Sequence, residues 1–238
     1  MALTQVDAGL LSSNAQEVGM KNRIIDGGFI INQRTYVSNT ALSSGTYAHD
    51  RWKAGSGGCT YTFTQGSLGV NTTITITAGT IVQVIEGCNL AEGGTYVLSW
   101  TGTAQGRLNS GTYGASGTVI ITGWTAGTNL NVEFNTGTLG SVQLEKGSTA
   151  TSFDYRPYSA ELAMCQRYYE TTARFQSGVA GSGGTNYATM VFKVTKRATP
   201  TVSGSGTGTI GTAYVDAVLL NRSGDPPDFS SLIISAEL

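Results

Sequence analysis

Apolar and polar residues alternate with a period of two along much of this chain. Tyr61 and Phe63 share one face of TYTFT, and Tyr96, Leu98 and Trp100 share one face of TYVLSW. Successive side chains of a β-strand point to opposite faces, so this pattern predicts strands that are buried on one side. Further segments of this kind cover residues 74–76, 81–85, 119–121, 130–134 and 142–146. The pattern predicts a β-sandwich or jelly roll of about eight strands over residues 22–156.

A different pattern follows the sandwich and predicts one short helix over residues 159–172. Ser159 is a good residue to cap its N-terminus. Leu162, Cys165 and Tyr169 then form one apolar stripe. Met164 and Tyr168 form a second, adjacent stripe. A helix that is apolar on two sides is usually covered by more than one surface, which is either a second domain or another copy of the chain.

After the helix the β pattern resumes, and it predicts a smaller β unit. Met190, Phe192 and Val194 alternate, and further strands are expected at residues 214–220 and 232–234. About four strands make a thin sandwich, which needs the helix or neighbouring copies to cover its faces. Two segments are Gly-rich: residues 177–187 are predicted to be a loop, and residues 203–211 a hairpin or a loop.

Composition agrees with an all-β protein that is rich in turns. Charged residues are only 12% of the chain, whereas glycine reaches 33 residues. The net charge of −1 and the absence of a basic run disfavour nucleic-acid binding. No apolar stretch reaches the length of a membrane span, and no signal peptide is recognisable at the N-terminus, so we expect no membrane insertion. The three cysteines, Cys59, Cys88 and Cys165, are predicted to be free and buried thiols.

The sequence contains few residues in patterns that are typical of catalytic sites. His49 is the only histidine, no nucleophile elbow accompanies it, and we expect it on the surface or in a loop. The neighbouring Asp50 and Arg51 are expected to form an ion pair beside Trp52. Metal-binding motifs are absent from the sequence. We therefore expect no enzyme activity, no metal and no cofactor.

Aromatic residues are the remaining lead, because sugar rings stack on them. Trp52, Trp100 and Trp124 lie in or beside predicted strands and are expected in the core. Tyr113 and Tyr187 lie instead in polar, Gly-rich segments. Loops on a rigid sandwich commonly carry binding sites, so Tyr113, Tyr187 and the adjacent Asn186 are the ligand-binding candidates.

Three segments carry a resemblance to a known family. The start of the chain reads NRIIDGGFIINQR and is followed by YAHDRW, the middle reads VQLEKGSTATSFDYRPYSAELAMCQRYYE, and the end reads SLIISAEL. These segments resemble bacteriophage tail-fibre and minor structural proteins, in which a jelly roll leads through a short helix into a terminal β domain. The resemblance touches about a third of the chain.

The resemblance implies four parts and a role. Residues 1–21 would be an N-terminal connecting arm, 22–156 a jelly roll, 157–175 a linker helix and 176–238 a C-terminal β domain. Such a protein would be part of the virion, assembled in the host cytoplasm, with the arm bound to other tail proteins. Its role would be adhesion to a host cell-surface glycan. The alternatives are an adaptor or capsid-decoration protein without receptor binding, and a sugar-binding module of a carbohydrate-active enzyme.

The resemblance to fibres also favours three copies about one axis. We therefore expect a homotrimer. The helix residues expected at or near the shared surface are Leu162, Met164, Cys165 and Tyr168.

Overall fold

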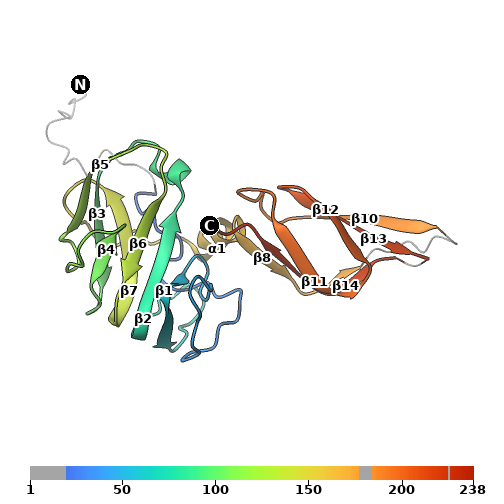
Figure 1. The fold of residues 1–238 in the computed structure, drawn as a ribbon, viewed down its shortest axis with the longest axis horizontal. Coiled ribbons are helices and arrows are strands. Elements are labelled where there is room, and N and C mark those ends of the chain that lie inside the picture. The colour runs from blue at the N-terminus through green and yellow to red at the C-terminus, as the bar shows by residue number, and fades with distance from the viewer. Residues whose placement is uncertain (1–19, 177–183, 225) are drawn as a thin grey trace, which may run out of the picture.

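The computed structural model describes residues 20–176, 184–224 and 226–238, and these residues are mostly β. Nearly half of the described residues are in strands, and among them one α-helix lies between the two groups of sheets (Figure 1). The helix is short, as the sequence predicted, and the sheets form a sandwich or barrel-like arrangement. The strands before the helix are β1 (Lys53–Phe63), β2 (Ile74–Ile85), β3 (Gly94–Thr101), β4 (Gly106–Leu108), β5 (Val119–Trp124), β6 (Leu130–Phe134) and β7 (Gly137–Lys146).

The seven strands form one bent sheet in the order β4-β6-β2-β7-β3-β5, with β1 paired to β2. Strand β7 lies at the bend and pairs with β2 on one side and with β3 on the other. Its first residues pair with β2, as in Leu139 opposite Ile74, and its later residues pair with β3, as in Leu144 opposite Leu98. Between these pairings Ser141 has a φ of 46°, which turns the strand.

The two ends of this bent sheet, β4 and β5, contact each other. The sheet therefore curls round on itself like a barrel that is not quite closed. The core inside is aromatic: Trp52 stacks on Phe29, and the Trp100 ring meets Phe134 edge-on. Trp52 and Trp100 are buried as predicted, and Trp124 is half-buried against the same core.

Residues 22–34 differ from the β pattern that the sequence suggested. They are largely buried but form no strand. Asp26 and Phe29 have φ values of 55° and 50°, which no strand accommodates. The Asn22 side chain binds the backbone of β7 in place of a strand partner, donating to the Val142 oxygen and accepting from the Leu144 N–H.

The helix α1 (Tyr158–Gln166) begins at Tyr158, with Pro157 as its N-cap, so the expected cap by Ser159 is wrong. Proline favours this position because it cannot donate a backbone hydrogen bond within the helix. The helix also ends earlier than predicted. The next residues are aromatic and β-branched, and they form β8 (Tyr169–Thr172).

The remaining strands form two small sheets. They are β9 (Phe175–Gln176), β10 (Thr185–Val191), β11 (Thr201–Thr207), β12 (Thr209–Ala213), β13 (Ala217–Ser223) and β14 (Asp228–Ser235). One sheet has the order β10-β13-β12, and the other is β11-β14-β8 with β9 also paired to β14. A small apolar core from both sheets contains Phe192, Leu220 and Leu232.

The Gly-rich segment 203–211 is therefore not a loop. It is mostly strand, and it passes from one small sheet to the other between β11 and β12. Gly206 and Gly208 take φ values of 159° and 143° at this crossing. Of the other predicted loop, residues 177–183 lie outside the described residues, and Tyr187 lies on β10.

Candidate functional site

The segments that carry the family resemblance meet around α1. Arg156, just before the helix, is buried and donates to the main-chain oxygens of Asn22 and Ile24. It also pairs with Glu161, at 3.1 Å from both carboxylate oxygens. Glu161 in turn accepts from the Asp26 N–H at 2.5 Å. One helix carboxylate thus links residues 22–26 to the turn that precedes the helix.

Arg51 forms the second link of this joint and is 1% exposed. Its guanidinium pairs with Glu237 and donates to the Val84 oxygen at 2.6 Å. It also lies over the Tyr168 ring, 3.6 Å from the centroid. Three parts of the chain are thereby joined: the YAHDRW segment, the end of the helix and the segment that follows β14. The expected Asp50–Arg51 pair is wrong, because Asp50 binds Gln33 and Arg34 instead.

A third link is the buried pair of Lys196 and Glu170, 2.6 Å apart. Lys196 also donates to the Gln166 oxygen at the end of α1. Burial lowers the pKa of Lys196, and its hydrogen bond to Glu170 opposes that shift. The three cations of the joint, Arg156, Arg51 and Lys196, are thus each paired with a carboxylate of the same chain.

His49 lies in a bend outside the strands, which agrees with the expected loop position, but it is buried in the core beside this joint and not on the surface. It is 0% exposed, and its Nδ1 is 2.8 Å from the Tyr61 hydroxyl. Burial lowers the pKa of His49 to about 4. Burial raises the pKa of Asp50 to about 6, against the opposing charge of Arg34. Neither residue is positioned as a base towards an open cleft.

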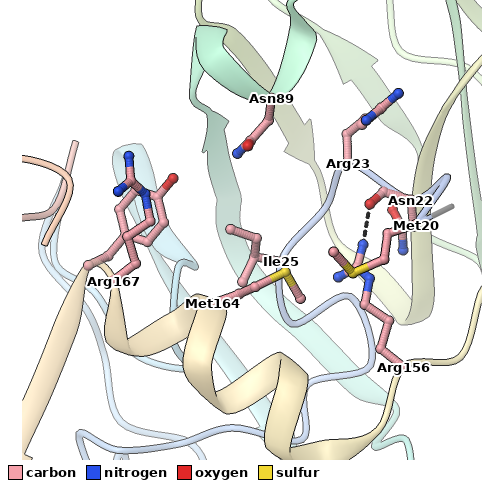
Figure 2. A pocket seen from close by; sticks show the side chains of 9 residues that line it. Met20, Asn22, Arg23, Ile25, Asn89, Arg156, Met164 and Arg167 are labelled. Atoms are coloured by element: carbon pink, nitrogen blue, oxygen red, sulfur yellow. Dashed lines mark hydrogen bonds between the residues drawn. The ribbon is translucent and has the colours of Figure 1, made fainter. Parts of the chain in front are cut away.

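A small cavity of about 130 Å³ lies beside α1 (Figure 2). Its wall is apolar where Met20, Ile25 and Met164 meet, and Asn89 faces it from the 3₁₀ turn η3 (Gly87–Leu90). Three arginines also line it, but their guanidinium groups do not converge. Arg23 points away from Met164 towards its partner Glu92, and Arg156 and Arg167 lie on opposite sides of Met164.

The predicted interface residues of the helix have two different environments. Cys165 and Tyr168 are fully buried against Ile25 and Ile31 of the same chain. The chain itself covers both side chains, and their place at or near a surface shared between copies stays a prediction. Leu162 and Met164 are half-buried and remain accessible to a partner.

The predicted ligand residues of the C-terminal part do not share one face. Tyr187 is 71% exposed on β10, and Asn186 precedes it on the same strand. Neighbouring side chains on a strand point to opposite faces. The residue directly opposite Tyr187 is Asn221 of β13, which shares its face. Asn221 is thus a polar neighbour of Tyr187 on this face, and the sequence alone could not identify it because the pairing register was unknown.

Tyr113 has a structural role in its loop. Its ring lies 4.6 Å from the Arg107 guanidinium, and Arg107 pairs with Glu133 at 2.6 Å. This contact ties the loop to the edge of the sheet. The loop itself borders a hollow of about 570 Å³ between β4 and β5, and Tyr113 is not among the residues that line the hollow. The binding role expected of Tyr113 stays a prediction.

The three cysteines are unpaired; Cys59 and Cys165 are buried as predicted, and Cys88 is exposed. Within the described residues no group of three or more His, Cys, Asp or Glu side chains is placed to hold a metal ion. No helix in the described part of the chain has the length and apolar character needed to cross a membrane.

Comparison of the chain with protein-family models, with curated proteins and with solved structures finds no match.

Proposed function

We propose that this chain is a tail-fibre type protein of a bacteriophage virion, which attaches the particle to its host cell. The observation that supports this proposal most is the joint around α1. The segments that resemble such fibres lie far apart in the sequence, yet Arg156 contacts Asn22 and Arg51 contacts Glu237. These contacts join the two β regions, as the connection between the domains of such a fibre would require.

We further propose a jelly-roll domain over residues 22–156, a linker helix over 157–175 and a C-terminal β domain over 176–238. Two separate apolar cores support this division. One contains residues between Ile24 and Leu144, and the other contains residues between Met190 and Ile234. A domain has its own core, so this separation agrees with two domains.

The proposed mechanism is adhesion without turnover. Weak binding sites repeated in a homotrimer would act together, so avidity would replace high affinity at one site. Tyr187 supports a glycan contact because its ring is exposed and the residue opposite it on β13, Asn221, is polar. In this arrangement residues 1–21 would bind other tail proteins, although residues 1–19 lie outside the described residues.

Adsorption to whole cells tests the proposal. The purified, fluorescently labelled chain would be mixed with a panel of bacterial strains, and bound protein would be measured after washing. We expect saturable binding to some strains, with loss of binding after periodate treatment of the cells, which destroys glycans. Binding to no strain, or equal binding to all of them before and after treatment, would contradict the proposal.

One observation favours a second function, that of an adaptor within the virion. The cavity beside α1 is walled by Met20, Ile25 and Met164, and an apolar site of this kind suits another protein better than a sugar. An adaptor would bind assembled tail parts but not cells. Incubating the chain with purified tails that lack it, followed by sedimentation, separates the two functions.

A further inference from the structure

The incompletely closed sheet leaves an opening between its two end strands. β4 and β5 are the last strands of the order β4-β6-β2-β7-β3-β5, and they contact each other without pairing. The hollow of about 570 Å³ lies at this opening and is lined from β4, β5 and the loop between Asn109 and Thr118. Its size falls within the usual range for small-molecule sites, and the mouths of barrels are common places for them.

The lining combines an apolar wall with free hydroxyl groups. Leu108, Val119 and Ile121 supply the wall, and they belong to or pack against the main core. Ser110 and Thr112 supply hydroxyl groups on the loop, both exposed. None of the ten lining residues is charged.

The loop that carries these hydroxyls is held in place. The Asn109 N–H donates to the Asn131 oxygen at 2.8 Å, and its side-chain oxygen accepts from the Asn131 N–H at 2.9 Å. Further along, Gly114 pairs with Gly106 of β4. The turn that carries Ser110 and Thr112 is therefore held by hydrogen bonds before a ligand binds. This limits the conformational entropy that the chain loses on binding.

The strand edges add backbone partners. Within the described residues β5 pairs with β3 alone, so its other edge, towards the hollow, has free N–H and C=O groups. An uncharged ligand that has both an apolar face and many hydroxyl groups matches this lining. Pyranose sugars have that character, whereas a phosphate or a carboxylate would find no cation here.

We propose that the hollow between β4 and β5 binds a ring of an uncharged saccharide. The ring packs one face on Ile120, a lining residue that is 43% exposed, and its hydroxyl groups bond to Ser110, Thr112 and the free edge of β5. The biological role of this site rests on the proposed adhesion function. The site would be a second sugar contact, on the first β region and away from Tyr187.

Direct binding tests the site separately from adhesion. Ligand-observed NMR would be recorded on the full chain with glucose, galactose, mannose and N-acetylglucosamine, and with glucuronate as a charged comparison. We expect at least one neutral sugar to bind and glucuronate to bind at least tenfold more weakly. The double variant Ser110→Ala, Thr112→Val removes two hydroxyl groups and should weaken binding about tenfold.

Thr122→Val is the matched control, because Thr122 lies on β5 but does not line the hollow. It should bind the sugar as the unchanged chain does. Binding by none of the neutral sugars, or equal binding by the double variant, would overturn the proposed site. If the double variant loses sugar binding and still adsorbs fully to cells, the site stands and its role in adhesion fails. If no variant adsorbs to any strain while sugar binding persists, the adhesion function fails alone.

Discussion

The guanidinium group of Arg51 lies over the ring of Tyr168, with 3.6 Å between the guanidinium carbon and the ring centroid. The same group pairs with Glu237, so one buried cation holds the helix end and the segment after β14 against the first β region. A buried charge left without its partner costs far more than an exposed one.

Replacing Arg51 with Met should therefore destabilise the chain strongly. Glu237 would keep Arg34 at 2.9 Å but would lose its buried partner, and we expect a loss of about 3 kcal/mol in the free energy of unfolding. Denaturant unfolding followed by circular dichroism measures this loss. Arg174→Met is the control, because the Arg174–Asp228 pair is mostly exposed and should contribute nothing measurable. Equal stability of the two variants would contradict the role of Arg51.

Gly106 should tolerate no side chain. A Cβ atom there would lie 2.7 Å from a ring carbon of Phe134 and 3.0 Å from the Trp100 ring, so Gly106→Ala should cost about 1–3 kcal/mol. A Cβ at Gly57 would meet nothing within 4 Å, and Gly57→Ala should change stability by less than about 0.5 kcal/mol. Thermal unfolding of both variants checks this difference, and a stable Gly106→Ala protein would show that β4 can shift.

Stability should depend on pH through His49 with a defined sign. The pKa of His49 is lowered to about 4 in the folded chain, whereas an unfolded histidine titrates near 6.5. Between these values only the unfolded chain takes up the proton, so this contribution is complete above about pH 6.5 and is lost as the pH falls towards 4. His49→Gln should remove a pH-dependent loss of up to about 3 kcal/mol. Parallel pH profiles of unfolding for the two proteins would contradict this prediction.

Asp50 should act in the opposite direction. Its pKa is raised to about 6, so the folded chain binds a proton more readily than the unfolded chain, and stability falls as the pH rises from about 4 to 6. The pH-dependent contributions of His49 and Asp50 to the stability therefore partly cancel in the unchanged protein. Asp50→Asn should therefore make the loss on acidification steeper, and the measurement is again unfolding between pH 4 and 7.

Tyr187 should matter for adhesion and not for folding. Tyr187→Ala removes an exposed ring, so the melting temperature should stay unchanged while adsorption to a sensitive strain falls several-fold. Tyr155→Ala is the control, because Tyr155 is equally exposed but lies in the connector before α1. Unchanged adsorption by Tyr187→Ala and Asn221→Ala together would move the receptor contact to another surface.

The assembly is predicted to be a trimer, and Leu162 and Met164 are the helix residues that could still contact a neighbouring copy. Light scattering at micromolar concentration should give three times the mass of one chain. Leu162→Arg should lower that mass without unfolding the protein, since Leu162 is not fully buried. The mass of a single chain for the unchanged protein would refute the trimer.

The sequence could predict the strands because apolar and polar residues alternate wherever a strand is buried on one face. Tyr96, Leu98 and Trp100 are all buried on β3, as their spacing implied. The helix position was also recognisable, but its end was not. Tyr169 continued the apolar stripe in the sequence, whereas in the structure it opens β8, whose pairing with β14 depends on residues more than sixty positions away.

The candidate site was harder to predict because long-range register decides it. Nothing near Tyr187 in the sequence identifies Asn221 as its neighbour, since only the pairing of β10 with β13 brings them together. The burial of His49 and the ion-pair partner of Arg51 were likewise not predictable, because polar residues are usually exposed and only Tyr61 and Glu237 make burial favourable here. The hollow between β4 and β5 depends on how the sheet curls, which no local pattern encodes.

The joint around α1 also determines how the molecule would carry a mechanical load. The chain leaves the first β region through α1 and β8, and β14 returns beside β8 so that Glu237 reaches Arg51. A pull on the distal sheets would thus be divided between two antiparallel strands that are bonded to each other and anchored separately. Rupture would require the buried ion pairs and the strand pairing to fail together in shear, so tension at the far end would reach the first β region with little bending.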